Sequence, residues 1–133
     1  MTGEGDLAIL VASMCPVLMD GEYVFCTFQD AQYGDYLDLE PIVTIKESEG
    51  LTLVVPKNKA DDKDLSYESV FKGITLSVHS SLDAVGLTAA FSSKLSEHGI
   101  SANVIAGYYH DHIFVQKELA DKAIEALNEL ARS

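Results

Sequence analysis

The sequence predicts an α+β fold in which helices cover one face of an antiparallel sheet. Within residues 73–115 an alternating apolar run leads into a helical pattern, and two short apolar runs flank a turn behind it. A second helical pattern follows at residues 119–130, with its apolar residues on one stripe. Strand–helix–strand crossovers are right-handed and make their two strands parallel, and a tight hairpin then adds an antiparallel strand. This order predicts a ferredoxin-like sandwich.

The spacing of apolar residues predicts where each of the central elements begins and ends. Residues 74–78 alternate apolar and polar, as in a half-buried strand, and helical spacing takes over after Leu82. Asp83 is the expected N-cap of that helix, and Gly99 the expected left-handed residue after its last turn. The second and third strands are expected at residues 102–106 and 112–115. The apolar residues assigned to the helix are Val85, Leu87, Ala90, Phe91 and Leu95.

This topology places several polar side chains at one edge of the sheet. The first strand ends near His79, and the second, which runs parallel to it, ends near Gly107. His98 falls at the opposite end of the helix between them. Of Tyr108 and Tyr109, one is expected to face the core and the other solvent, because strand side chains alternate. The residues expected to gather at this edge are His79, Ser80, Ser81, His110, Asp111 and His112.

Residues 1–70 predict a smaller set of elements that partly repeats the same order. A short apolar helix over residues 6–14 is followed by Pro16, which ends it, and a strand is expected at 23–28. The polar residues 29–40 form a loop. The expected elements that follow are strands 41–45 and 51–55, joined by a hairpin with Gly50 at positive φ, and helical turns at 57–64. We therefore expect two halves packed together, residues 1–70 and residues 71–133. A single α+β domain with an extended sheet is the alternative.

The composition limits which classes of function and partner are expected. The chain has 133 residues and a net charge of −12, from 21 acidic and 9 basic residues, and no basic patch that would suit a nucleic acid. No run of apolar residues is long enough for a membrane helix, and the N-terminus lacks a basic cluster. We expect a cytoplasmic protein that contacts neither nucleic acid nor membrane. Cys15 and Cys26 are expected to be reduced.

The central stretch resembles the ACT-domain family. The resemblance rests on residues 80–91, on Leu95, and on the run from His98 to Val104, with Tyr108 to Val115 filling the hairpin. The family usually has Pro-Gly in the loop before the helix, where this chain has Val85-Gly86. The whole chain is similar to small bacterial proteins of unknown function that have two ACT-like halves and are related to the regulatory region of aspartate kinases.

The resemblance implies a non-catalytic, regulatory protein that needs no cofactor. It implies an amino-acid effector bound at the loop after the first strand, in a homodimer or higher oligomer. The ligand-binding residues that the resemblance implies begin with His79, Ser80, Ser81, Leu82 and Asp83. The set continues with Val85, Gly86, Leu87, Asn103 and His110.

Two alternatives stay open. Three imidazoles, His79, His110 and His112, could hold Zn²⁺ or Ni²⁺, although His-x-His alone is a weak signal. The chain could also be a pure oligomerisation or interaction module. An enzyme is not expected, because the sequence has no nucleophile elbow, P-loop, Cys-x-x-Cys or dinucleotide fingerprint.

Overall fold

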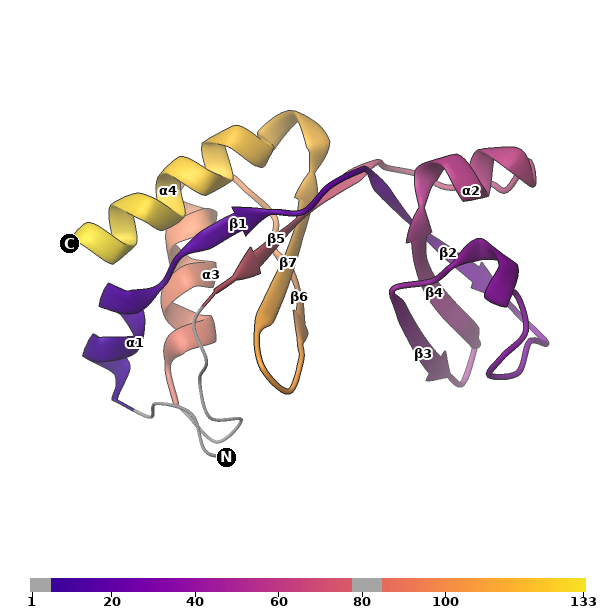
Figure 1. Ribbon diagram of the computed structural model, residues 1–133, viewed down its shortest axis with the longest axis horizontal. Helices are drawn as coiled ribbons and strands as arrows, with labels where there is room; N and C mark the ends of the chain where they lie inside the picture. Colours follow the sequence, from indigo (N-terminus) through magenta and orange to yellow (C-terminus); the bar gives the residue numbers. More distant parts are fainter. Residues whose placement is uncertain (1–5, 78–84) are drawn as a thin grey trace. The chain divides into compact units, whose positions relative to one another are not determined.

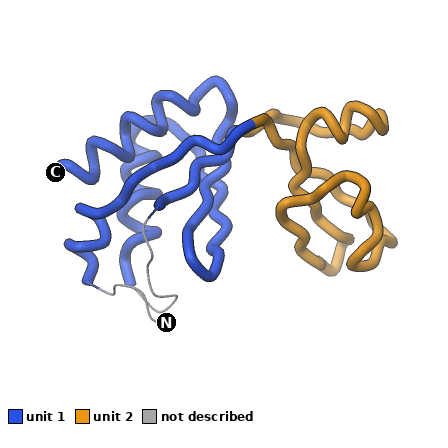
Figure 2. Tube along the Cα trace, in the orientation of Figure 1, with its two compact units in different colours: residues 1–20, 72–133 blue, residues 21–71 orange. Residues whose placement is uncertain are grey.

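The computed structural model describes residues 6–77 and 85–133 (Figure 1). The chain forms two compact units (Figure 2): unit 1 consists of Met1–Asp20 and Lys72–Ser133, and unit 2 of Gly21–Phe71. Unit 2 ends at Phe71, whereas the expected halves were residues 1–70 and 71–133. Residues up to 20, however, group with the C-terminal part of the chain. Unit 2 is therefore inserted within unit 1 along the sequence.

Unit 1 is a ferredoxin-like sandwich whose strands come from both ends of the chain. Its sheet has the order β1-β5-β7-β6. The N-terminal β1 pairs antiparallel with β5, from Pro16 opposite Leu76 to Leu18 opposite Ile74. The elements of unit 1 are α1 (Leu7–Ser13), β1 (Pro16–Leu18), β5 (Phe71–Leu76), α3 (Leu87–Glu97), β6 (Asn103–Ala106), β7 (Asp111–Gln116), the 3₁₀ turn η2 (Lys117–Leu119) and α4 (Ala120–Arg132). The first residue of β5, Phe71, belongs to unit 2.

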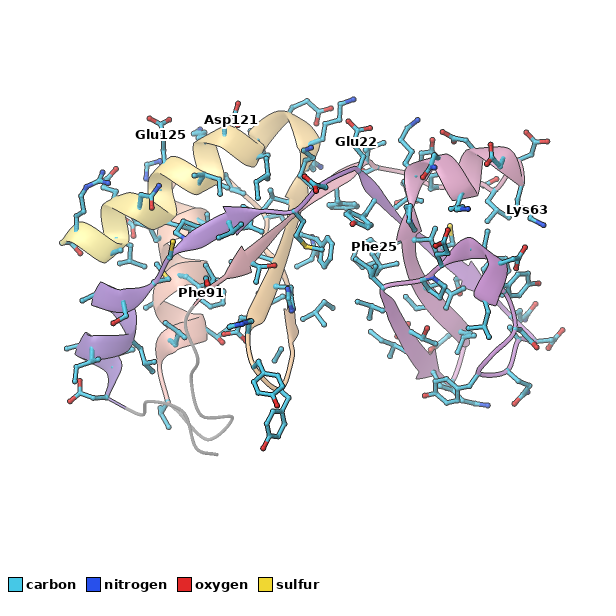
Figure 3. All side chains as sticks on the ribbon, viewed as in Figure 1. Glu22, Phe25, Lys63, Phe91, Asp121 and Glu125 are labelled. Carbon is cyan, nitrogen blue, oxygen red and sulfur yellow. The ribbon has the colours of Figure 1, made fainter. Side chains whose placement is uncertain are left out.

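The helices and the apolar residues of alternate strand positions form the core of unit 1. Ile74 and Leu76 on β5 and Ile113 and Val115 on β7 are fully buried on the face that the helices cover. Burying one such side chain contributes about 1.5–3 kcal/mol. The helices add Leu10, Leu87, Phe91, Leu95, Ala123, Ala126 and Leu127 to the same cluster. Figure 3 shows the charged Asp121 and Glu125 of α4 projecting outward, away from this core.

Unit 2 repeats part of the strand order of unit 1, with three strands and one α-helix. Its sheet runs β3-β4-β2, and Tyr23 at the start of β2 pairs with Phe71. A loop with a short 3₁₀ turn connects β2 to β3 where a ferredoxin-like fold has its first helix, as the polar composition of residues 29–40 predicts. The elements are β2 (Tyr23–Phe28), the 3₁₀ turn η1 (Leu37–Leu39), β3 (Val43–Glu47), β4 (Gly50–Pro56) and α2 (Lys57–Asp62).

The core of unit 2 is closed by η1 and α2 together. Leu39 of η1 is only 1% exposed and packs into this core. Two ion pairs of 2.8 Å connect the two elements, Lys59 to Glu40 and Lys63 to Asp38. Hydrogen bonding from Lys63 lowers the pKa of the Asp38 carboxyl. The buried residues of this core are Val24, Cys26, Leu39, Leu51, Leu53, Val55 and Ala60.

Most predicted elements are confirmed, but the start of the central helix is corrected. Gly86, with φ 101°, and not Asp83, stands at the N-cap of α3, which begins at Leu87. A residue in the left-handed region interrupts helical hydrogen bonding, so Val85 lies outside the helix and is 84% exposed. The predicted left-handed Gly99 is confirmed, with φ 72°.

The tip of the β6–β7 hairpin is also corrected. The amide of Gly107 donates to the carbonyl of His110, which closes the turn. Tyr108 and Tyr109 therefore lie in the turn and not on a strand, so the alternation of strand side chains does not apply to them. Both are mostly exposed, and their rings meet edge to face with centroids 5.0 Å apart.

Candidate functional site

The candidate site is the edge of unit 1 where β5 ends, α3 begins and the β6–β7 hairpin turns. The strand order β5-β7-β6 brings these three segments to the same end of the sheet, as predicted. Figure 1 shows α1 lying at this end as well. Five predicted ligand-binding residues lie outside the described residues: His79, Ser80, Ser81, Leu82 and Asp83.

The N-terminal end of α3 carries two predicted site residues with different surroundings. A Cβ atom on Gly86 would lie 3.0 Å from Cδ2 of Leu7, so α1 covers this glycine closely. Leu87 is 4% exposed, and its side chain packs in the core of unit 1. Only the backbone of Leu87 can therefore face a ligand. Because Gly86 has no side chain, nothing from the N-cap residue accepts from the N–H groups of the first turn, which can bind an anion.

The hairpin contributes His110 and, on β7, His112. His110 is partly buried, and its carbonyl accepts from Gly107. Nδ1 of His112 lies 3.0 Å from Oγ1 of Thr75 on β5, so these two side chains connect neighbouring strands. Both side chains belong to the sheet face opposite the helices, because Ile74 and Ile113 beside them point into the core.

Burial changes the titration of two groups at this edge. It lowers the pKa of His112, and the neighbouring His110 acts in the same direction while Asp111 opposes both. Burial also raises the pKa of the Asp111 carboxyl, which the two imidazoles partly offset. Both groups therefore favour their neutral forms more than they would in water.

Asn103 lies at the far end of the sheet from the hairpin. Its position at the start of β6, opposite Phe114, places it there. The side-chain amide of Asn103 donates to the carbonyl of Phe114 at 3.2 Å. This bond gives the asparagine a role in strand pairing, and its contact with a ligand stays a prediction.

The structure describes two of the three histidines in the metal-site hypothesis, His110 and His112. Among residues 6–77 and 85–133, no three side chains of His, Cys, Asp and Glu gather in an arrangement that could hold a metal ion. The third predicted ligand, His79, lies outside these ranges. The three-histidine site thus stays untested.

Sequence reasoning missed Leu7 and Thr75, both of which contact candidate residues. Leu7 belongs to a recognised apolar helix, but no local signal connects it to Gly86, far along the chain. Thr75 is a polar residue between Ile74 and Leu76, so its position on the helix-free face was readable from the alternation. Its hydrogen bond to His112, by contrast, could not be read from the sequence.

Comparison with known proteins gives the family. ACT-domain profiles match the chain over residues 2–72 and again over residues 68–129. The chain belongs to the ACT-domain family. The two matches meet near residue 70, so the sequence of each ACT domain corresponds to one half of the chain. In space, the α1 and β1 segment of the first match packs with the second.

Solved structures of several other proteins are similar to this fold. A protein of unknown function from Vibrio cholerae, described as a possible transport protein, is 61% identical, with TM-score 0.86 over 94% of this chain and 95% of that one. A protein from Agrobacterium tumefaciens is 16% identical, with TM-score 0.74 over 89% of each chain. The ligand-free regulatory subunit of aspartate kinase from Thermus thermophilus is 10% identical, with TM-score 0.63 over 86% of this chain and 95% of that subunit.

The distant similarities show the tandem ACT fold alone. Comparison with curated proteins gave no significant match. No helix among the described residues combines the length and the apolar character needed to cross a bilayer.

Proposed function

We propose that this ACT-domain protein is a non-catalytic regulator that binds an amino-acid effector at the edge of unit 1. The site comprises residues 79–83, Val85, the backbone of Gly86 and Leu87, and His110. Asn103, which the family resemblance also implies, lies at the other end of the sheet. The protein needs no cofactor in this function and works in the cytoplasm.

One observation carries the proposal: α3 begins at an edge of the sheet with a glycine N-cap. The N–H groups of its first turn have no intrahelical partners, because the first such bond runs from the amide of Ala90 to the carbonyl of Gly86. Unpaired N–H groups at a helix N-terminus favour a carboxylate. Such help is needed in a chain with a net charge of −12, which repels anions at long range.

The hairpin supplies the second half of the proposed site. His110 can offer a polar contact to the ammonium or carboxylate of an amino acid, and the two exposed tyrosines at the tip can cover it. Membership of the ACT-domain family and the fold shared with aspartate kinase regulatory subunits support a regulatory role. Neither identifies the effector.

A homodimer or higher oligomer is part of the proposal. The strands β3 and β6 stand at the ends of their sheets, and an unpaired strand edge tends to pair with another chain. Light scattering coupled to size-exclusion chromatography should give a mass of at least twice 14.4 kDa. A monomer at micromolar concentration would contradict this part.

The binding proposal is tested by isothermal titration calorimetry against each of the twenty standard amino acids. We expect one amino acid, or a chemically related group, to bind the wild-type protein. The Gly86→Val variant should lose binding, because a β-branched residue cannot adopt φ 101° without strain and its side chain would collide with Leu7. Gly99→Val, at the other end of α3, is the matched control and should keep it. The absence of a binding heat for all twenty amino acids at millimolar concentration would refute an amino-acid effector.

A further inference from the structure

The N-terminal arm, defined as α1 and β1 with residues 6–19, touches the chain on both sides of segment 78–84. On the far side, Leu7 of the arm packs on Gly86: a Cβ atom there would lie 3.0 and 3.5 Å from the two methyl carbons of Leu7. Only the absence of a side chain at Gly86 permits this approach. The arm thus lies against the N-cap residue of α3.

On the near side, the arm holds the end of β5. The amide of Ser77 donates to the carbonyl of Cys15 at 2.8 Å, one residue beyond the last member of β5. The amide of Met19 likewise donates to the carbonyl of Gly73 at 2.8 Å, so the arm follows β5 along its length. The last described residue before the segment is therefore bonded to the arm.

The helix of the arm, α1, depends on a few buried side chains. Leu10 and Met14 are buried in the core of unit 1, and α1 lies beside α3 and α4 (Figure 1). Leu7 and Ile9, by contrast, are 40% and 51% exposed. The helix has seven residues, too few to be stable without tertiary contacts. The helix therefore depends on these contacts, and removal of one of them should loosen α1 before the rest of unit 1.

We propose that the arm is a clamp that sets the separation of the two flanks of segment 78–84, with Leu7 as the positioning residue for the first turn of α3. The inference rests on the proposed function, since that segment carries predicted effector residues. When the arm is docked, Ser77 and Gly86 are both held. When it undocks, the first turn of α3 and the end of β5 loosen together, and effector affinity falls.

Amide hydrogen–deuterium exchange of the full chain tests the clamp without any ligand. In Leu7→Ala, we expect the amide of Ala90, which bonds to Gly86, to exchange several-fold faster than in the wild type. Ile9→Ala is the matched control: it shortens a somewhat more exposed apolar side chain on the same helix and should leave that amide unchanged. Leu7→Met, which keeps the apolar bulk, should restore slow exchange. Equal exchange in Leu7→Ala and Ile9→Ala would overturn the clamp.

A second variant tests the near flank. Leu10→Ala removes the buried anchor of the arm and should speed exchange at Ser77 and Ala90 together, relative to the amides of β7. Acceleration at only one of the two positions would overturn the coupling.

Ligand titration separates this inference from the proposed function. With the amino acid that binds the wild type, Leu7→Ala should raise the dissociation constant several-fold, whereas Ile9→Ala should not. Unchanged affinity in Leu7→Ala would refute control of effector binding by the clamp. If no amino acid binds the wild type, the proposed function fails, and the exchange experiments alone decide whether the clamp exists.

Discussion

At the residue scale, Gly86 combines a left-handed backbone with a close neighbour. A side chain at this position would therefore carry two separate energetic costs, which can be measured apart. Gly86→Ala should destabilise the protein by about 1–2 kcal/mol for the backbone, with an added cost for the contact with Leu7. Gly99→Ala is the control, because its φ is 72° and a Cβ there would meet nothing within 4 Å. Urea unfolding should show the larger loss for Gly86→Ala. An equal loss of stability in the two variants would mean that the Leu7 side chain moves aside without a measurable cost.

His112 should make stability depend on pH. Burial lowers its pKa in the folded protein, so between the folded and unfolded values the unfolded chain binds more protons. Its contribution is therefore complete above the unfolded value, near 6.5, and is lost as pH falls through the folded value. Asp111, whose pKa is raised, acts in the opposite direction at lower pH. His112→Asn can keep a bond to Thr75 without titrating.

The test compares unfolding free energies between pH 7.5 and pH 5.5. The wild type should lose more stability on acidification than His112→Asn, while a His98→Asn control removes a histidine from the opposite end of α3. Identical slopes in the wild type and His112→Asn would show that burial of this imidazole has no effect on folding.

At the element scale, the ion pairs between α2 and η1 should hold the loop that replaces a helix in unit 2. Lys59→Gln and Lys63→Gln together should speed amide exchange in residues 36–42, because each removes a 2.8 Å pair to this loop. Lys57→Gln is the control, since its partner Asp61 lies on α2 itself. The effect should be small, as for exposed pairs generally, and should vanish in high salt. Equal exchange in both variants would contradict it.

The sequence predicts the long elements well and the short ones poorly, for physical reasons. The strand 23–28 is found as expected because aromatic and β-branched residues, which favour strands, fill most of it. The strand β1 was missed because three residues carry no period, and Pro16 is equally a helix stop and the first residue of an edge strand. Its pairing with β5 depends on residues far along the chain.

The candidate site shows the same limit. Topology alone predicted the meeting of β5, α3 and the hairpin at one edge. The start of α3 was misplaced, since both Asp83 and Gly86 are acceptable caps by composition and only the backbone conformation distinguishes them. The contact of Leu7 with Gly86 has no local signal in either segment.

At the scale of the whole molecule, the two units have separate cores and should lose protection separately. Leu53→Ala in unit 2 should cost about 2–5 kcal/mol and Phe91→Ala in unit 1 about 3–5 kcal/mol, as for other buried large-to-small changes. Exchange monitored along the chain should rise first over residues 21–71 in Leu53→Ala, and over the rest in Phe91→Ala. A uniform rise in either variant would show that the chain unfolds as one unit.

The origin of unit 1 from both ends of the chain has a consequence for synthesis on the ribosome. Unit 2 is complete once Phe71 has emerged, whereas β1 has no partner until β5 follows, and α1 none until α3 and α4 are made. At about 5–20 residues per second, the apolar segment from Leu7 to Met14 waits for several seconds with its side chains in water. During translation, this exposed apolar segment is a place where a nascent-chain chaperone would bind.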